Sequence, residues 1–416
     1  MNFPICISNK RIKNDIKNLF SFGTTDEGGV TRLPFTKEDD DARNYLINTM
    51  KEIGLSVKVD AIGSIFGRIE GNDPNAPTVI IGSHYDTVKN AGSLDGILGV
   101  VSGLEIARII KEKNLKFKYP IEIMAINDEE GVRFGGGFLG SRALIGDLTI
   151  DELYSMKDNQ NITLADAMIE HNFNPKNIYD AARKKEDIRA FLELHIEQGP
   201  ILDSLNRDIG IVNSIVGMQR YIVNIHGRPD HAGTTPMNMR LDALDASSKI
   251  IQNVRDWALM EEDGAVATIG YFNVEPSAVN IVPSDVTFSI DVRAKNSSTI
   301  NRIVDKITNK IKETCGDDLA FDISKTIDVL PVNLSSDFCG IIKNSCEKRN
   351  YSNISMVSGA GHDSLIMANF TDVGMIFVPS KDGRSHCPEE FTDEKYIRIG
   401  TEVLFDTLIE VAELIN

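Results

Sequence analysis

The stretch Pro77-Thr-Val-Ile-Ile-Gly-Ser-His-Tyr-Asp86 joins a short apolar, β-branched run directly to a histidine and an aspartate. A run of this kind predicts a strand that is buried on both faces, as in a parallel sheet covered by helices. Comparable runs recur at Ile121–Ile126, Phe191–Leu194 and Val373–Val378, and helical patterns alternate with them. This alternation predicts an α/β fold built on a mixed sheet.

Residues that can bind metal ions follow each of these four runs. They are His84, Asp95, Glu130, His195 and His386. In open α/β sheets, ligands bind at the carboxyl ends of the strands, so we expect the five side chains to converge on one crevice. Imidazoles and carboxylates suit zinc or a similar first-row ion. Two such ions about 3.5–4 Å apart generate hydroxide at neutral pH and polarise a carbonyl, which predicts a dinuclear metallohydrolase.

Each of the five residues also has an ordinary structural role when it is considered alone. Asp95 precedes the helical pattern within Leu94–Ile110 and is there a typical helix N-cap. His195 and His386 are each typical of a histidine at the edge of a core, and His84 of a loop histidine near a turn. The metal hypothesis therefore depends on the five residues together, each near a predicted strand end.

Two acidic positions near these ligands strengthen the hypothesis. Glu129 and Glu130 are adjacent after a predicted buried strand. Adjacent carboxylates repel and cost desolvation energy unless a cation is present. Asp86 lies two residues after His84, and in an extended segment both side chains point the same way. Asp86 is therefore expected to hold the ring of His84 in place.

Composition and charge exclude several classes of protein. The chain has 416 residues and a net charge of −17, so it is long enough for two domains and repels nucleic acid and anionic membranes. No run of eighteen apolar residues predicts a spanning helix, and the first residues do not resemble a signal peptide. Five scattered cysteines suit reduced thiols, and we expect a cytoplasmic protein.

The pattern changes near residue 214, where an alternating strand pattern begins. The expected elements are a strand at Gln219–His226, a helix at Asp242–Leu259, strands at Ala265–Val274 and Ser284–Arg293, a helix at Ser298–Thr314 and a strand at Ala320–Leu330. This β-α-β-β-α-β order predicts a ferredoxin-like α+β module. The module separates the His386 segment from the other ligands. We therefore expect a discontinuous catalytic domain, 1–213 and 331–416, and an inserted domain, 214–330.

Several motifs carry a resemblance to a known family. The general motifs are Gly82-Ser-His-Tyr-Asp-Thr87, Asp95-Gly96 and Glu129-Glu130. The more specific ones are Glu130-Gly-Val-Arg-Phe134, Gly140-Ser-Arg-Ala143, His195-Ile-Glu-Gln-Gly-Pro200 and His231-Ala-Gly-Thr-Thr-Pro-Met237. Over nearly its whole length the chain resembles the M20 metallopeptidase-like hydrolases. Within that family it resembles the carbamoylase-type amidases, which act on N-carbamoyl-L-amino acids, allantoate or N-carbamoyl-β-alanine.

The resemblance implies how the metal ligands divide. Asp95 would bridge two divalent ions, with His84 and His195 on one ion and Glu130 and His386 on the other. The native metal stays open, because these ligands accept zinc, manganese, cobalt or nickel, with zinc expected first. Glu129 would be the general base that takes a proton from water, since it is adjacent to a ligand and free for proton transfer.

The resemblance also implies residues that contact the substrate. His231 would stabilise the oxyanion on the substrate carbonyl, and Asn280 and Arg293 would anchor a carboxylate, which the planar guanidinium meets with two hydrogen bonds. Gln198, Gln219, Gly359 and His362 would complete this set. Considered alone, Arg293 is equally typical of a surface ion pair, Asn280 of a turn and His231 of a solvated loop.

The implied activity is hydrolysis of the ureido C–N bond of a small carboxylate, with release of ammonia and carbon dioxide. The inserted domain would serve as a lid and as the surface of a homodimer. Allantoate-type members place a glutamine one position before Gln219, and one position reverses the face of a strand, so allantoate and N-carbamoyl amino acids both remain open. Two other functions also stay open: a dipeptidase or aminoacylase of the same fold, and an inactive binding protein on the same scaffold.

Overall fold

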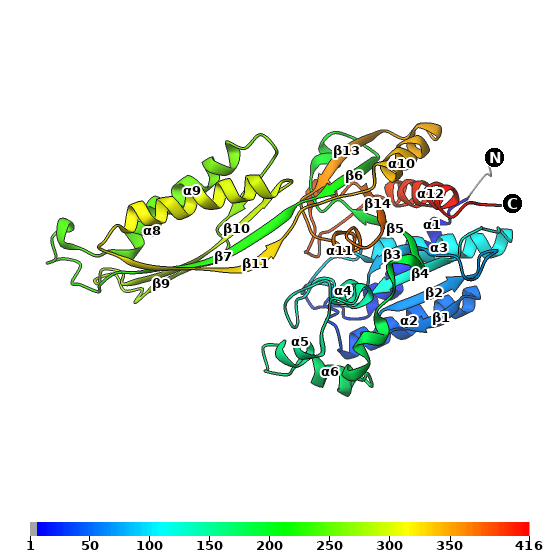
Figure 1. The fold of residues 1–416 in the computed structure, drawn as a ribbon, viewed down its shortest axis with the longest axis horizontal. Coiled ribbons are helices and arrows are strands. Elements are labelled where there is room, and N and C mark those ends of the chain that lie inside the picture. Colours follow the sequence, from blue (N-terminus) through cyan, green and yellow to red (C-terminus); the bar gives the residue numbers. More distant parts are fainter. Residues whose placement is uncertain (1–5, 416) are drawn as a thin grey trace. The chain divides into compact units, whose positions relative to one another are not determined.

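The apolar runs of the sequence form the centre of a nine-stranded mixed sheet in the computed structural model, which describes residues 6–415 (Figure 1). The central strands are β4 (Ile121–Ile126), β3 (Thr78–His84), β5 (Ile188–Ile196) and β14 (Asp372–Val378), and neighbours among them pair in parallel. Every residue of β3 and β4 is buried, as the continuous apolar runs predict. The carboxyl ends of these strands therefore lie at one edge of the sheet.

Further strands extend the sheet on both sides of this centre, and β2 and β6 pair antiparallel with the central strands β4 and β14. On one side lie β2 (Ile65–Ile69) and β1 (Ser56–Val59), and on the other lie β6 (Ile209–Ile215), β12 (Val332–Asn333) and β13 (Asn353–Ser358). The predicted α/β class with a mixed sheet is confirmed.

Helices cover the sheet and fix its buried side chains. The long helices are α1 (Asn9–Ser21), α2 (Lys37–Ile53), α3 (Ile97–Lys113), α10 (Ser336–Lys348) and α12 (Glu394–Val411). The short helices are α4 (Leu139–Ile145), α5 (Ile150–Ser155), α6 (Leu164–Glu170), α7 (Ile201–Ser204) and α11 (Asp363–Met367). The helix α3 packs against β3, β4 and β5 and is buried over most of its length, which explains why its sequence is apolar all round.

The start of α3 decides between two roles for Asp95. The N-cap of α3 is Gly96, with φ 66°, and no side chain caps the helix. The alternative that Asp95 is the N-cap is therefore wrong, and its carboxylate is left for other partners.

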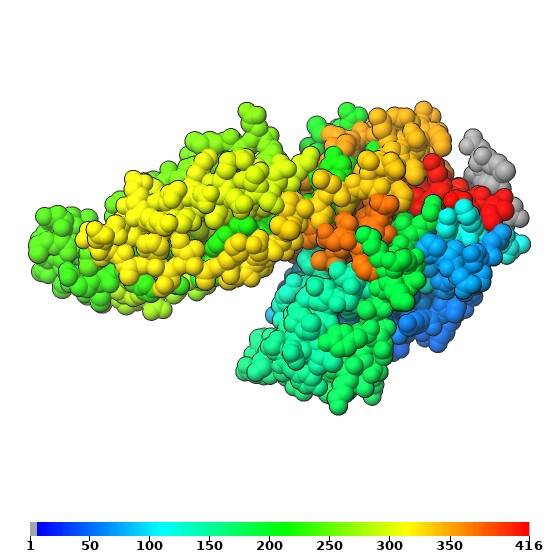
Figure 2. Space-filling model, viewed as in Figure 1, coloured from blue at the N-terminus to red at the C-terminus, as the bar shows by residue number. Residues whose placement is uncertain are grey.

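The inserted segment folds as a five-stranded antiparallel sheet with two helices. Its elements are β7 (Gly217–His226), α8 (Ala243–Leu259), β8 (Val266–Thr268), β9 (Phe272–Glu275), β10 (Asp285–Ala294), α9 (Ser297–Cys315) and β11 (Ala320–Val329). The strand order is β11-β7-β10-β8, with β9 also on β10, which is the ferredoxin-like order. Side chains of α9, coloured yellow, cover one face of this part in the space-filling view (Figure 2).

The strand expected at Ala265–Val274 is interrupted. Both of its pieces pair with β10, but between them the N–H of Tyr271 donates to Oγ of Ser289 at 3.0 Å rather than to a backbone carbonyl. Gly270 lies in this gap, and glycine weakens a strand.

The chain divides into two compact units. Unit 1 holds the described residues up to Asn213, Asn333–Met356 and the described residues from Ala360, and unit 2 holds Ser214–Val332 and Val357–Gly359. Residues 331–332 and 357–359 thus belong to unit 2, whereas the sequence placed them in the first domain. Within residues 6–415, no helix is both long and apolar enough to cross a bilayer.

Candidate metal centre

The five expected ligands lie together at the carboxyl edge of the central sheet in unit 1. His84 is the last residue of β3, and His195 is the last but one of β5. Asp95 directly precedes the N-cap of α3. Glu130 follows β4, and His386 lies in the loop after β14. Parallel pairing of these strands is what brings residues so distant in sequence to one place.

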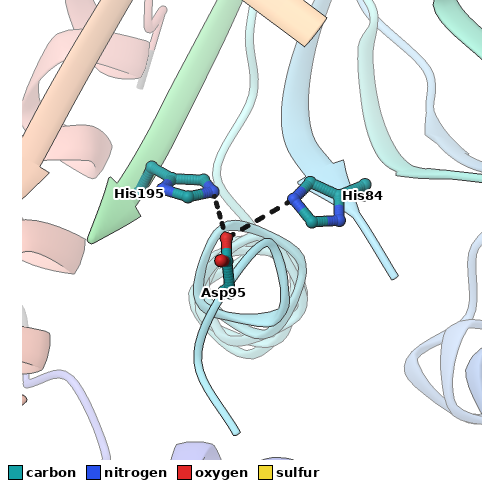
Figure 3. A group of neighbouring side chains, drawn as sticks. All are labelled: His84, Asp95 and His195. Atoms are coloured by element: carbon teal, nitrogen blue, oxygen red, sulfur yellow. Dashed lines mark ion pairs between the residues drawn. The ribbon is translucent and has the colours of Figure 1, made fainter. Parts of the chain in front are cut away.

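Asp95 is at the centre of the group. Its Oδ1 lies 3.1 Å from Nε2 of His195 and 3.7 Å from Nε2 of His84, and both rings point toward it (Figure 3). Its Oδ2 lies 3.0 Å from Nε2 of His386, which in turn lies 3.4 Å from Oε1 of Glu130. One carboxylate thus faces two histidines with one oxygen and the third histidine with the other.

The ligand atoms form two triads that share this carboxylate. One triad is His84, Asp95 and His195, and the other is Asp95, Glu130 and His386; in each, the ligand atoms lie within 4.8 Å of one another. A third grouping with the same spacing combines His84 with Glu129 and Glu130. The first two groupings are the division that the family resemblance implied.

The two triads differ in exposure. His84, Asp95 and His195 are buried, whereas the side chain of His386 is 47% exposed. A cavity of about 470 Å³ opens on the exposed side, and its lining includes Gln198, Arg384, His386 and Cys387. The second triad therefore borders this cavity through His386.

The charges of the group call for a cation. Burial by itself raises the pKa of Asp95, but its contacts with His195, His386 and His84 hold that pKa well below the usual range. The carboxylates of Asp95 and Glu130 raise the pKa of His386 to about 10. Histidine must be neutral to bind a metal, so a metal ion would replace the protons that these pKa values favour.

One buried atom independently tests whether these residues suit a metal ion. Within residues 6–415, no group donates a hydrogen bond to Oδ1 of Asp95, although this oxygen is buried. A buried oxygen without a donor is costly unless a cation compensates it. The carboxylate that contains this atom and the two imidazoles beside it are ligands of the kind that zinc binds.

Glu129 lies beside the triads. Its buried carboxylate has Oε2 at 3.9 Å from Nε2 of His84. Burial and the neighbouring carboxylate of Glu130 raise the pKa of Glu129 well above its usual value, against the charge of His84. A carboxylate with a raised pKa next to a metal site is suited to accept and return a proton at neutral pH.

Asp86 holds the acidic pair more directly than it holds His84. Its two carboxylate oxygens accept the backbone N–H groups of Glu129 and Glu130 at 3.0 and 3.1 Å. Nδ1 of His84 lies 3.2 Å from the carbonyl oxygen of Asp86 and 3.7 Å from its carboxylate. Asp86 therefore fixes the loop after β4 as well as the ring that the sequence assigned to it.

The sequence missed two residues that position Asp95. Glu390 is buried and accepts the backbone N–H groups of Leu94 and Asp95 at 2.8 and 3.1 Å. The hydroxyl of Ser385 lies 3.0 Å from Oδ2 of Asp95 and 2.7 Å from Oε2 of Glu390. Glu389-Glu390 repeats the adjacent-acid pattern of Glu129-Glu130, which was the available signal.

Two residues that were expected to bind the substrate contact the expected metal ligands. Nε2 of Gln198 donates to Oδ2 of Asp95 at 2.8 Å and lies 3.3 Å from Nε2 of His386. The ring of His362 is buried against the ring of His195, with centroids 4.4 Å apart. Gln198 therefore faces the cavity, whereas His362 supports a ligand ring from behind.

His231 and Asn280 lie side by side in unit 2. The N–H of Ala232 donates to the carbonyl of Asn280 at 3.0 Å, and both His231 and Asn280 are exposed. Nδ1 of His231 accepts the N–H groups of Gly233 and Thr234 at 3.0 and 3.2 Å. Since Nδ1 is an acceptor, the neutral ring carries its proton on Nε2 and can donate a hydrogen bond from that atom.

Arg293 and Gln219 lie on opposite faces of the sheet of unit 2. Arg293 donates from Nε to Oδ1 of Asp291 at 2.9 Å and from Nη1 to the carbonyl of Gly359 at 3.2 Å. The amide of Gln219 instead contacts Asn301 on α9 and Asp328 on β11. The expected substrate contact of Gln219 does not fit this position, because its side chain packs on the helix side.

Comparison with known proteins finds relatives over nearly the whole chain. The model of Peptidase family M20/M25/M40 matches residues 80–410. The chain belongs to this family. An N-carbamoyl-L-amino-acid amidohydrolase of Paenarthrobacter aurescens is 42% identical over 95% of this chain and 96% of its own. An allantoate amidohydrolase of Bacillus subtilis is 35% identical over 96% and 98%.

A solved structure extends the likeness to three dimensions. It is an amidase of the hydantoinase/carbamoylase family from Burkholderia multivorans, with a TM-score of 0.90, 30% identity and 98% of each chain covered. The M20 family is metal-dependent, and the His, Asp and Glu groups of this member are able to hold metal. These relatives are amidohydrolases that act on C–N bonds other than peptide bonds.

Proposed function

We propose that this M20 member is a two-metal amidohydrolase that cleaves the ureido C–N bond of a small carboxylate and releases ammonia and carbon dioxide. The observation that carries the proposal is the pair of ligand triads that share Asp95, with Glu129 beside them. The names of relatives that are 35–42% identical over nearly the whole chain support the ureido substrate class.

The residues that would hold the ions follow the two triads. His84 and His195 would hold one divalent ion, Glu130 and His386 the other, and Asp95 both, with zinc favoured and manganese, cobalt or nickel accepted by the same ligands. Bound ions of this kind lower the pKa of water toward neutrality and polarise a carbonyl.

Side chains of this protein would transfer the proton and stabilise the charges of the reaction. Glu129 would take the proton of the attacking water and return it to the leaving nitrogen, which its raised pKa favours. Nε2–H of His231 would donate to the oxyanion that forms on the ureido carbonyl, because Nδ1 is occupied as an acceptor. Asn280 and the outer nitrogens of Arg293 would bind the substrate carboxylate. Gln198 would contact the substrate in the cavity.

Unit 2 would act as the lid and as the surface of a homodimer. The edge strands β8 and β9 and the gap between them carry exposed apolar side chains: Val266 and Tyr271 are each 52% exposed and Phe272 is 43% exposed. An exposed apolar edge is a typical pairing surface between copies of a chain. Sedimentation equilibrium tests this part: a dimer is expected, and a monomer at micromolar concentration would contradict it.

The activity is tested with a panel of substrates. The metal-loaded protein is assayed for ammonia release from allantoate, N-carbamoyl-L-amino acids and N-carbamoyl-β-alanine, and for amine release from dipeptides. Turnover of at least one ureido acid, absent from a Glu129→Gln preparation, supports the proposal. Hydrolysis of dipeptides alone would replace it with a peptidase. Metal binding without any turnover would indicate an inactive binding protein.

A further inference from the structure

Two arginines share one carboxylate on the face of the unit 2 sheet that points away from its helices. Arg220 on β7 lies directly opposite Asp291 on β10, and Arg293 lies opposite Met218. Residues opposite each other in an antiparallel pair, and residues two apart on a strand, share a face. Arg220, Asp291 and Arg293 therefore form one row of charges on one face.

The contacts in this row are specific. Arg220 donates from Nε and Nη2 to Oδ2 of Asp291 at 3.1 and 2.7 Å, while Arg293 donates from Nε to Oδ1 at 2.9 Å. Each guanidinium thus has its own carboxylate oxygen. The side chain of Asp291 is 16% exposed, that of Arg293 31% and that of Arg220 39%. Asp291 is the innermost of the three, and the arginines lie nearer to solvent.

Asp291 orients Arg293 and also opposes its charge. The bond from Nε to Asp291 and the bond from Nη1 to Gly359 hold the guanidinium in place and leave Nη2 for a ligand. A carboxylate this close also repels any anion that approaches Arg293. By themselves Asp291 and Arg293 would be a neutral pair and a weak site for a carboxylate.

Arg220 removes this conflict. Its two hydrogen bonds neutralise Asp291 from the other side, so the three residues together keep one net positive charge. Burial by itself would raise the pKa of Asp291, but Arg293 and Arg220 hold that pKa below its usual value, so the carboxylate stays ionised and keeps both guanidinium groups in place.

We propose that Arg220 is a positioning residue for recognition of the substrate carboxylate: it neutralises Asp291 so that Arg293 is both held in one orientation and net cationic. One net charge suits a substrate with a single carboxylate at this site. The inference depends on the proposed function, because it takes Arg293 as the anchor of that carboxylate.

The first test is Arg220→Gln, compared with wild type on an N-carbamoyl-L-amino acid and on its carboxamide. KM for the carboxylate should rise about tenfold, as expected for the loss of one nearby charge, while kcat stays within about twofold. KM for the uncharged carboxamide should not change. Arg302→Gln is the matched control, because Arg302 pairs with Glu261 on the helix side of the same unit. It should change neither KM.

The second test restores the charge without restoring the arginine. In the double variant Arg220→Gln/Asp291→Asn, the conflicting carboxylate is gone and Arg293 again has a net positive charge. KM for the carboxylate should return to within about threefold of wild type. A damaged fold would not be rescued in this way, so recovery separates charge balance from loss of structure.

The failures of the two proposals are distinguishable. If wild type turns over no ureido acid, the proposed function fails. If wild type is active but Arg220→Gln leaves KM for the carboxylate unchanged, the role of Arg220 is overturned. An equal rise in KM for carboxylate and carboxamide, or a double variant no better than the single one, overturns it as well.

Discussion

The two units of this chain differ in how the charge of a central carboxylate is compensated. In unit 1, the carboxylate of Asp95 is buried, faces three imidazoles, and has an oxygen that accepts no hydrogen bond within residues 6–415. In unit 2, the carboxylate of Asp291 is balanced by two guanidinium groups of the chain itself. A bound cation would complete the first arrangement, whereas the protein itself completes the second. Metal should therefore matter to one unit and charge substitution to the other.

The strongest test of this contrast is Asp95→Ala. We expect it to lose both ions and all activity, because the residue shared by the two triads is gone. Chelation of wild type should lower its Tm, since a ligand that binds only the folded state stabilises it, whereas Asp95→Ala should not respond. Elemental analysis and thermal unfolding provide the measurements. Full metal content or full activity in Asp95→Ala would end the two-metal hypothesis.

Glu129→Gln separates the base from the ligands. Turnover should fall by about 10²–10⁴-fold, the usual contribution of a general base, while metal content stays at the wild-type level. Glu130→Gln is its matched control and should lose metal as well, since Glu130 belongs to a triad and lies 3.4 Å from His386. An equal loss of metal in both variants would refute the division of this pair.

Gly96→Ala and Gly264→Ala each add one Cβ atom, the first in unit 1 and the second in unit 2. Both glycines have positive φ, 66° and 76°, so alanine strains the backbone at each position. At Gly96 a Cβ would also lie 2.4 Å from the ring of His84, whereas at Gly264 it meets no atom within 4 Å. Metal affinity should therefore fall about 10–100-fold in Gly96→Ala only. Titration with zinc checks this; equal affinities would show that the His84 ring is not held by this contact.

Arg293→Lys probes unit 2 and should have the smallest effect. KM for a ureido carboxylate should rise about tenfold, because an ammonium is a point charge and cannot replace a planar fork. Metal content and kcat should stay near wild type, and KM for the carboxamide analogue should be unaffected. A similar loss with both analogues would mean that Arg293 does not anchor the carboxylate.

The sequence predicted the elements that have strong local patterns. It was less successful where a hydrogen-bond partner on another strand sets the bounds of an element. The runs at Ile121–Ile126 and Val373–Val378 are strands within one residue of their predicted bounds. The run Ala265–Val274 contains two strands, because Ser289 on a neighbouring strand takes the N–H of Tyr271. Periodicity within a run carries no information about such a partner.

The same limit applies to the candidate site. His84, His195 and Glu130 were predictable because each ends or follows an apolar run, and their metal-binding roles stay predictions. Glu390 was missed although it fixes the backbone at Asp95, since its position relative to that segment is set by tertiary folding. Gln219 was assigned to the substrate, but the register of β7 turns its side chain toward α9.

By itself, the sequence determined the α/β class, the inserted ferredoxin-like order and the kinds of side chain that could hold metal, because these depend on local periodicity and residue chemistry. Only the tertiary structure decided which atoms meet. It placed three histidines around the two oxygens of Asp95 and freed that residue from capping α3. It also set Arg220 against Asp291, because the pairing of distant strands fixes which residues stand opposite each other.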